Sequence, residues 1–398
     1  MTTTRISVDA EGTVVNEGTI TIQDSSQGRP EAIGNSGLFN NRMTGRIFIQ
    51  DVYGIGAINN YGGFENAGTL SIIRATGGSV SNRGTFSNLG TFKVRDASGQ
   101  IFYNTGDEFI NEGLIEADNV GPDFMRAIVG TITNSGTIRV NNPGELKMTM
   151  SSGAVFNNSG ELSLVAGDGF LLRCTRGGRF NLSDGFVAGN GIIQWCDLNL
   201  AGELSPGNSP GRITFDSDLN FSGNYLWEAA GTAGPATVGG YDQVRINGRL
   251  NLTGSLTVNL LDDFVPESGD RFEIFSCGGG CAGSFDDLDV PDENWSVEVT
   301  GNSVWLVYTV FDPNAHNSLH FDGSDDYVLG TSNSSLELAA GTIDLWIKPA
   351  TSTRRQTFLS YRSEDGFQTR YLWNFLENLD GVGFWNGSTY TAVFYNFS

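Results

Sequence analysis

The feature of the sequence that most restricts the fold is a short phrase, Asn-x-Gly followed by alternating apolar residues, which recurs through the first half of the chain. From residue 66 to residue 158 the copies lie 22, 23, 23 and 24 residues apart. A degenerate copy at residues 41–45 divides the preceding interval into two steps of 25. The clear copies begin at Asn16, Asn66, Asn88, Asn111, Asn134 and Asn158.

A companion Asn-x-Gly phrase precedes many of these copies by six or seven residues. It begins at Asn35, Asn60, Asn82 and Asn104. The residue between the two phrases is often aromatic, as at Phe39, Phe64, Phe86, Phe109 and Phe156.

A unit of this length holds three short strands and three turns, but it cannot bury its own apolar face and must stack on its neighbours. We therefore predict an all-β fold: a right-handed parallel β-helix of 22–25 residues per coil with a C-terminal cap, then a partial antiparallel β-sandwich. Left-handed hexapeptide helices have a six-residue period and leucine-rich repeats have helical returns, so neither fits. The rival is an ordinary β-sandwich with regularly spaced turns.

The corner residues suggest their own roles. Asn tolerates the left-handed backbone region and Gly accepts positive φ, so both are expected there to make the turn. An Asn repeated at one corner can also form a hydrogen-bonded ladder along the stack. The apolar residues that follow are expected to form inward columns.

The four cysteines divide into two plausible pairs. Cys277 and Cys281 flank three glycines, which allows a small disulfide loop, and Cys174 and Cys196 are one coil apart, where they could bond or simply stack. Such pairing favours an oxidising compartment. A zinc site is the rival interpretation, weakened because His316 and His320 lie far away in the sequence.

Charge limits the partners. The formal net charge is −22, and the only lysines are Lys93, Lys147 and Lys348, so nucleic acid and anionic lipid are poor partners. No apolar run approaches the roughly 20 residues that a membrane-spanning helix needs, so we expect no membrane insertion in this chain. Because the first residues lack a signal-peptide core, either a secretion signal has been lost or the chain is a fragment.

Beyond residue 185 the repeat fades into other motifs. Residues 204–211 read Leu-Ser-Pro-Gly-Asn-Ser-Pro-Gly, and residues 241–248 read Tyr-Asp-Gln-Val-Arg-Ile-Asn-Gly. This wording resembles the C-terminal part of bacterial autotransporter passenger solenoids, and with the repeats the resemblance extends over about residues 10–310. It implies solenoid repeats at 1–185, and terminal coils and a cap at 186–311. All seven tryptophans lie at or after Trp195, which suits a closing structure.

Residues 312–317 look like a linker, and two phrases follow it. They are Leu-His-Phe-Asp-Gly-Ser-Asp-Asp-Tyr-Val at 319–328 and Trp-Ile-Lys-Pro at 346–349. They resemble the opening of the laminin-G-like, concanavalin-A-like jelly-roll family, which implies the N-terminal part of such a domain at 318–398, truncated in mid-pattern. Asp322, Asp325 and Asp326 are the best candidate metal ligands, for calcium, although the phrase is mostly structural in that family. No other cofactor is expected.

Parallel solenoids also carry polysaccharide lyases and glycoside hydrolases, which need clustered carboxylates. Here the acids of the repeats, such as Asp107, Glu108, Glu112 and Glu116, are scattered among Asn, Ser and Thr. We therefore expect no enzyme but a secreted or cell-surface adhesion protein, in which a solenoid stalk presents a sandwich that binds glycans or surface and matrix proteins. The alternatives are a polysaccharide-degrading enzyme and an ice- or matrix-binding solenoid, for which the threonines after the corner glycine form only an interrupted column.

Overall fold

The computed structural model describes residues 2–3, 5–25, 31–53, 56–182, 184–196, 198–207 and 210–310, together with the backbone of four strands in the C-terminal part. The chain divides into two compact units, Met1–Asp312 and Pro313–Ser398. The described residues contain no α-helix, and none of them forms a helix that could cross a membrane.

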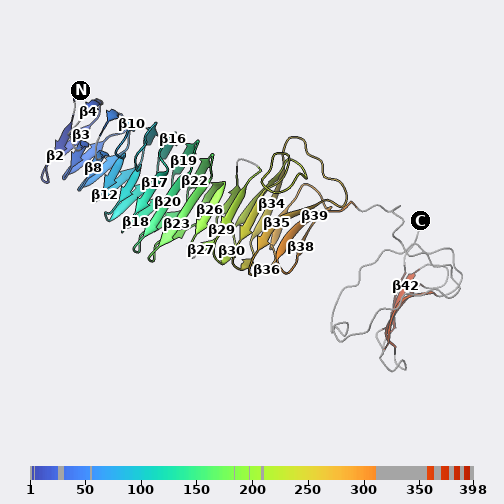
Figure 1. Ribbon diagram of the computed structural model, residues 1–398. Coiled ribbons are helices and arrows are strands. Elements are labelled where there is room, and N and C mark those ends of the chain that lie inside the picture. The colour runs from blue at the N-terminus through green and yellow to red at the C-terminus, as the bar shows by residue number, and fades with distance from the viewer. Residues whose placement is uncertain are drawn as a thin grey trace. The chain divides into compact units, whose positions relative to one another are not determined.

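The first unit is a right-handed parallel β-solenoid, in which each coil contributes one strand to each of three long sheets (Figure 1). This confirms the predicted fold class. Sheet A has 13 strands. They are β1 (Thr2–Thr3), β4 (Thr19–Ser25), β7 (Arg46–Val52), β10 (Thr69–Ala75), β13 (Thr91–Arg95), β16 (Leu114–Asp118), β19 (Thr137–Asn142), β22 (Glu161–Ala166), β25 (Phe186–Gly189), β28 (Glu203–Pro206), β31 (Asn224–Ala229), β34 (Ser255–Leu260) and β37 (Asp287–Asp289).

Sheet B has 14 strands, and its pairings are parallel except for the two that β39 makes, with β35 and β38. They are β2 (Ile6–Val8), β5 (Glu31–Asn35), β8 (Gly56–Asn60), β11 (Val80–Asn82), β14 (Phe102–Asn104), β17 (Asp123–Ala127), β20 (Leu146–Ser151), β23 (Phe170–Thr175), β26 (Gly191–Gln194), β29 (Arg212–Phe215), β32 (Gln243–Ile246), β35 (Arg271–Cys277), β39 (Ser303–Tyr308) and β38 (Trp295–Val299).

Sheet C forms the third wall with eight strands, and sheet D continues after it with four. A parallel bridge between Leu182 and Leu200 lies between the two sheets. Sheet C contains β3 (Thr13–Asn16), β6 (Leu38–Asn41), β9 (Gly63–Asn66), β12 (Thr85–Asn88), β15 (Glu108–Asn111), β18 (Thr131–Asn134), β21 (Val155–Asn158) and β24 (Arg179–Asn181); sheet D contains β27 (Leu198–Leu200), β30 (Leu219–Phe221), β33 (Leu250–Leu252) and β36 (Cys281–Gly283).

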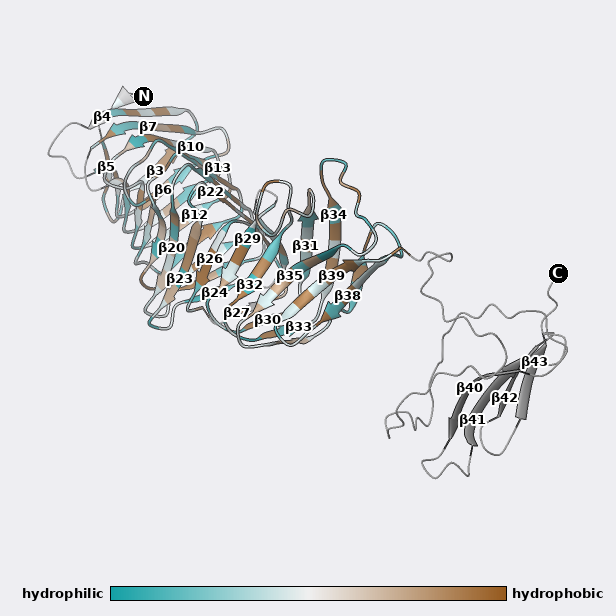
Figure 2. Cartoon of the chain, turned by 45° about the vertical axis from the view of Figure 1, so that its right-hand side comes forward, coloured by the Kyte–Doolittle hydropathy of each residue, from teal (hydrophilic) through white to brown (hydrophobic). Residues whose placement is uncertain are grey.

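The core consists of inward columns of apolar side chains. Figure 2 shows the alternation of hydrophobic and hydrophilic residues along the strands, which predicts this arrangement. In sheet C the rings of four coils lie almost parallel, with centroids 4.9, 5.0 and 5.1 Å apart. This spacing is close to the distance between paired strands, so each ring packs on the equivalent ring of the next coil. The stack is formed by Phe39, Phe64, Phe86 and Phe109, the aromatic residues that the repeat singles out.

The C-terminal end of the solenoid abandons the parallel pattern. Strand β39 pairs antiparallel with both β35 and β38. Large aromatic side chains of these strands pack together and on β31: Trp227 contacts Phe272 at 5.1 Å, and Trp295 contacts Tyr308 at 4.9 Å between ring centroids. An antiparallel closure of this kind caps a stack whose last coil would otherwise leave an apolar face open.

The second unit contains a four-stranded antiparallel sheet in the order β40–β41–β42–β43. Its strands are β40 (Gln356–Arg362), β41 (Thr369–Phe375), β42 (Gly381–Trp385) and β43 (Tyr390–Phe394). The predicted linker at 312–317 and the jelly-roll opening at 318–349 lie outside the described residues.

The expected role of the corner residues in the backbone is wrong. None of the Asn residues of the phrase, and none of the glycines that follow them, has positive φ. Left-handed residues instead end the sheet A strands, at Asp51, Arg74, Asp96 and Asn119, with φ between 50° and 60°. The corners use Asn and Gly for reasons of packing, which the following section describes.

Candidate functional site

A ladder of asparagine side chains runs inside the corner between sheets C and A. Each Nδ2 donates to the Oδ1 of the next coil at 2.6–2.8 Å. The side chains are buried, and their Nδ2 atoms also donate to backbone carbonyls, as Asn111 does to Thr137 at 3.1 Å. The ladder contains all six asparagines singled out in the sequence and the degenerate copy: Asn16, Asn41, Asn66, Asn88, Asn111, Asn134 and Asn158.

A second ladder, which the sequence reasoning did not predict, runs inside the corner between sheets B and C. The companion asparagines Asn35, Asn60, Asn82 and Asn104 bond in turn at 2.7, 2.8 and 2.7 Å. The coil before Asn35 carries Val8 at that position, and among the described residues the buried Oδ1 of Asn35 has no hydrogen-bond donor. The equal period of the two phrases was the signal that could have revealed this ladder.

The glycines of these corners are required by close stacking. A Cβ built on Gly90 would lie 2.2 Å from the carbonyl oxygen of Gly68, and one on Gly113 would lie 2.1 Å from that of Gly90. Such contacts are far shorter than any van der Waals separation, so a side chain would force the coils apart. Gly18 in the first such corner has nothing within 4 Å of its Cβ position, which shows that the requirement comes from the coil beneath.

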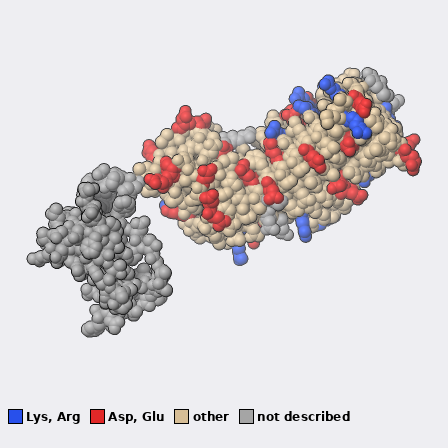
Figure 3. Space-filling view, turned by 180° about the vertical axis from the view of Figure 1, so that it is seen from behind, with Lys and Arg blue, Asp and Glu red and all other residues tan. Residues whose placement is uncertain are grey.

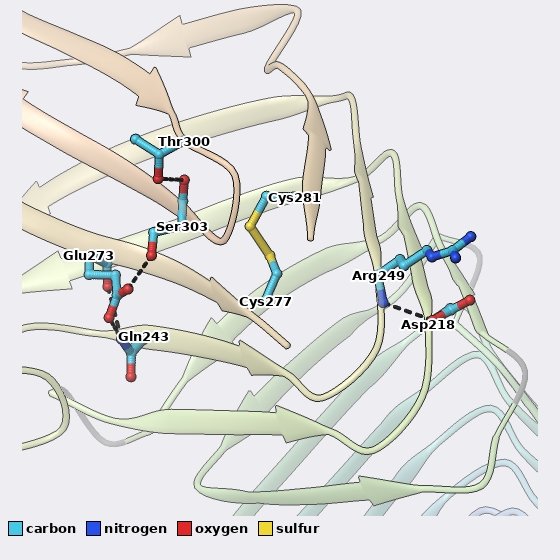
Figure 4. The surroundings of a disulfide bond; sticks show 8 residues. All are labelled: Asp218, Gln243, Arg249, Glu273, Cys277, Cys281, Thr300 and Ser303. Atoms are coloured by element: carbon cyan, nitrogen blue, oxygen red, sulfur yellow. Dashed lines mark hydrogen bonds between the residues drawn. A yellow bond between two sulfur atoms is a disulfide. The ribbon is translucent and has the colours of Figure 1, made fainter. Parts of the chain in front are cut away.

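Both proposed cysteine pairs are disulfides in the structure. Cys174 bonds to Cys196 across adjacent coils, with a Cα–Cα distance of 5.0 Å. Cys277 bonds to Cys281 at the cap, with a Cα–Cα distance of 5.6 Å, and Figure 4 shows this second bond. In the same region Gln243 donates to Glu273 at 2.9 Å, and the backbone N–H of Arg249 donates to Asp218 at 2.8 Å, so polar contacts also join these coils.

A buried carboxylate joins three segments near the cap. The Oδ1 of Asp242 accepts a hydrogen bond from the Gly211 N–H at 2.6 Å, and its Oδ2 accepts one from the Glu228 N–H at 3.2 Å. The backbone carbonyl of Asp242 accepts the indole N–H of Trp227 at 2.8 Å. Asp242 thereby ties the turn that ends at Gly211 to strands β31 and β32.

Burial raises the pKa of Asp242 to about 8, with the charge of Glu228 adding to the shift and the two backbone N–H bonds opposing it. In the unfolded chain this carboxyl has the ordinary pKa of 3.8. Between these values the folded protein holds a proton that the unfolded chain releases, so the free energy of unfolding falls as pH rises. The sequence placed this residue in a recognisable motif but gave no sign of its burial.

A cavity of about 460 Å³ opens beside the Cys174–Cys196 disulfide. It lies where β23 turns into β24, and the next coil adds Trp195 to its wall. Arg176 and Arg179 line it, and the guanidinium carbon of Arg173 lies 4.4 Å from the centroid of the Trp195 ring. Sequence reasoning missed this group because its members become neighbours only through the stacking of two coils.

Of the carboxylates considered for catalysis, Glu116 pairs with Lys93 of the preceding coil. Glu161, which was not among them, pairs in the same way with Arg139. The residues that the structure describes contain no group of three or more His, Cys, Asp or Glu side chains arranged to hold a metal ion. Asp322, Asp325 and Asp326, the calcium candidates, lie outside the described residues, so that prediction stays a prediction.

The threonine column on the outer face of sheet A is interrupted, as the sequence indicates. Thr91 pairs with Thr69 of the preceding coil and with Leu114 of the next. Leu114 pairs in turn with Thr137, and Thr137 pairs with Glu161. Arg46 adds a further interruption between Thr19 and Thr69. A regular flat array, which an ice-binding face needs, is therefore not formed by this column.

Figure 3 shows carboxylates spread over the face of the solenoid that it draws.

Comparison with models of known protein families gives no match, and comparison with curated proteins gives none either. The resemblances to autotransporter passengers and to laminin-G-like domains therefore remain predictions from sequence motifs.

Proposed function

We propose that the chain is a non-catalytic adhesion protein of the cell exterior or cell surface, in which the solenoid is a structural stalk and the C-terminal unit binds a glycan or a surface or matrix protein. The observation that carries the proposal is the uninterrupted parallel register of sheet A, with an asparagine ladder inside the adjoining corner. At about 4.8 Å per coil, 13 strands extend over roughly 60 Å.

Such a stack suits a stalk because each coil contacts only its neighbours, so length is gained by adding coils without enlarging the core. The buried amides support one register in particular, since a slip of one residue would place Asn111 opposite Thr133 or Ser135 instead of Asn134 and break the ladder. The two disulfides support an oxidising environment, which is the condition outside the cytosol.

The competing function is polysaccharide cleavage on the same scaffold. Observations favour the stalk, because Glu116 and Glu161 lie in ion pairs between coils rather than opposite each other across a groove. A pair of catalytic carboxylates would need to face a substrate at a separation of roughly 5–10 Å.

The test uses the full chain in two assays. Binding is screened on an array of glycans and matrix proteins, and turnover is screened on a polysaccharide panel by the release of reducing ends and unsaturated uronides. Saturable binding to an immobilised ligand without turnover is the expected result. Turnover that is abolished by one acid-to-amide substitution would overturn the proposal in favour of an enzyme.

A further inference from the structure

The cavity beside the Cys174–Cys196 disulfide has the features of a ligand site. Its volume of about 460 Å³ lies within the range of small-molecule sites, roughly 300–1,000 Å³. Its lining joins an aromatic ring, two guanidinium groups and glycine backbone. The wall comprises Cys174, Thr175, Arg176, Gly177, Gly178, Arg179 and Trp195.

The aromatic ring is presented to solvent by a strained backbone. Trp195 has φ of 58° and is 55% exposed. A bulky residue in the left-handed region costs about 1 kcal/mol or more. Ser152 and Arg176 have the same conformation after the two preceding sheet B strands, so the geometry of the corner sets this backbone and directs the indole outward. The neighbouring Cys196 is bonded to Cys174 of the preceding coil, so the disulfide fixes the indole beside the turn at 176–178.

The cavity is lined by positively charged side chains, whereas the protein as a whole is strongly negative. In a chain of net charge −22, three arginines fall within seven residues: Arg173, Arg176 and Arg179. Among the described residues none of the three forms an ion pair, whereas Arg74 and Arg139 each pair with a carboxylate of an adjacent coil. The Nε of Arg173 is buried, and no described residue forms a hydrogen bond with it.

These features select the chemistry of a ligand. Guanidinium groups bind carboxylate and sulfate oxygens through paired hydrogen bonds. An indole offers an apolar face on which the C–H face of a sugar ring can pack. Because Arg173 already stacks at the Trp195 ring, the pair forms a platform that is polarised toward a negatively charged partner. A neutral sugar would leave the arginines unused, and a simple inorganic anion would leave the indole unused.

We propose that this cavity binds one unit of an acidic saccharide, with the sugar ring on Trp195 and its carboxylate or sulfate between Arg176 and Arg179. The site lies on the solenoid itself, so it assigns a ligand to the part of the chain for which only a structural role is otherwise inferred. It does not depend on what the C-terminal unit binds.

The experiment titrates the full chain with three oligosaccharides of equal length and follows tryptophan fluorescence and heat of binding. The three are an oligogalacturonate, a chondroitin sulfate and a neutral malto-oligosaccharide. Binding of at least one acidic oligosaccharide with Kd below about 1 mM is expected, with at least tenfold weaker binding of the neutral one. Oligogalacturonate carries carboxylates only, whereas chondroitin sulfate carries carboxylates and sulfates. Binding of chondroitin sulfate alone would therefore assign recognition to the sulfate.

Three variants locate the site. Trp195→Ala and the double variant Arg176→Ala/Arg179→Ala are each expected to weaken binding at least tenfold. Arg83→Ala is the matched control, because Arg83 also stacks on an exposed aromatic ring, that of Tyr61 at 4.9 Å, but lies elsewhere on the solenoid. It is expected to leave binding unchanged.

The double variant replaces only the exposed side chains of Arg176 and Arg179 and leaves the core unchanged. It therefore remains informative if Trp195→Ala destabilises the coil. Unchanged circular dichroism with lost binding supports the site. Absence of binding to both acidic ligands, equal binding of the neutral one, or full binding by the double variant would overturn it. Array binding that the double variant retains is assigned to other parts of the chain, so failure of this site and failure of the proposed adhesive function are distinguishable.

Discussion

Replacing one buried asparagine in the middle of its ladder should destabilise the solenoid severely. In Asn111→Ala the Oδ1 of Asn134 loses its 2.7 Å donor, and the Nδ2 of Asn88 loses its 2.7 Å acceptor. Asn111 is fully buried, so water cannot replace these partners. Two lost hydrogen bonds cost about 1 kcal/mol each, and the orphaned acceptor adds about 1–3 kcal/mol. We expect a loss of about 3–5 kcal/mol.

The matched control is Asn157→Ala, which removes an asparagine whose side chain points outward. Asn157 accepts a 2.6 Å hydrogen bond from Asn181 of the next coil, but this bond is exposed and Asn157 itself is only half-buried. Such substitutions change the free energy of unfolding by about 0.5 kcal/mol or less. The two variants therefore differ in burial while sharing residue type and contact between coils.

The assay combines denaturant unfolding with hydrogen exchange. Because stacked coils can unfold in parts, exchange at residues 85–140 reports the local effect directly. Asn111→Ala should accelerate exchange in the coils on both sides of the substitution, and Asn157→Ala should not. If the two variants lose equal stability, to within about 0.5 kcal/mol, then the buried ladder does not stabilise the stack and the reasoning fails.

Three further predictions follow from the contacts between coils. Gly90→Ala, whose Cβ would lie 2.2 Å from a carbonyl oxygen, should lower the thermal midpoint clearly, whereas Gly18→Ala, with open space, should leave it unchanged; thermal melts check both. Removal of the Cys174–Cys196 disulfide by substitution with alanines should cost about 3 kcal/mol, from the chain entropy of a loop of 22 residues, and denaturant titration of oxidised protein measures this loss. Because the pKa of Asp242 is raised to about 8, stability should fall as pH rises from 4 to 8, and Asp242→Asn should flatten that fall; unfolding at pH 5 and pH 8.5 tests the sign, which a rise would contradict.

The fold could be predicted from the sequence because the same pattern of corner and strand residues recurs in successive coils. Each copy from Asn66 to Asn158 carries a polar corner and an apolar strand, so the period, the inward columns and the axial alignment follow from one argument. The period places Cys174 and Cys196 on adjacent coils, which left a bond and simple stacking both open, and the flexible spacer between Cys277 and Cys281 allowed the second disulfide; the structure shows both bonds.

The physical role of the corner glycines could not be read from composition. A glycine that permits positive φ and a glycine that permits close approach look alike in a sequence, and only the carbonyl of the coil beneath distinguishes them. The same limit hid Asp242 and the cavity at Trp195. Both depend on residues 14 to 31 positions apart that meet only when coils are stacked.

The account depends on the stacking of coils about buried asparagine amides, and a cryo-electron microscopy or crystallographic map of the full chain tests this most directly. The predicted result is density for parallel strands about 4.8 Å apart, with Asn88, Asn111 and Asn134 superposed along one axis and continuous side-chain density between them. A map in which these asparagines face solvent, or in which neighbouring strands of residues 85–140 run antiparallel, would contradict it.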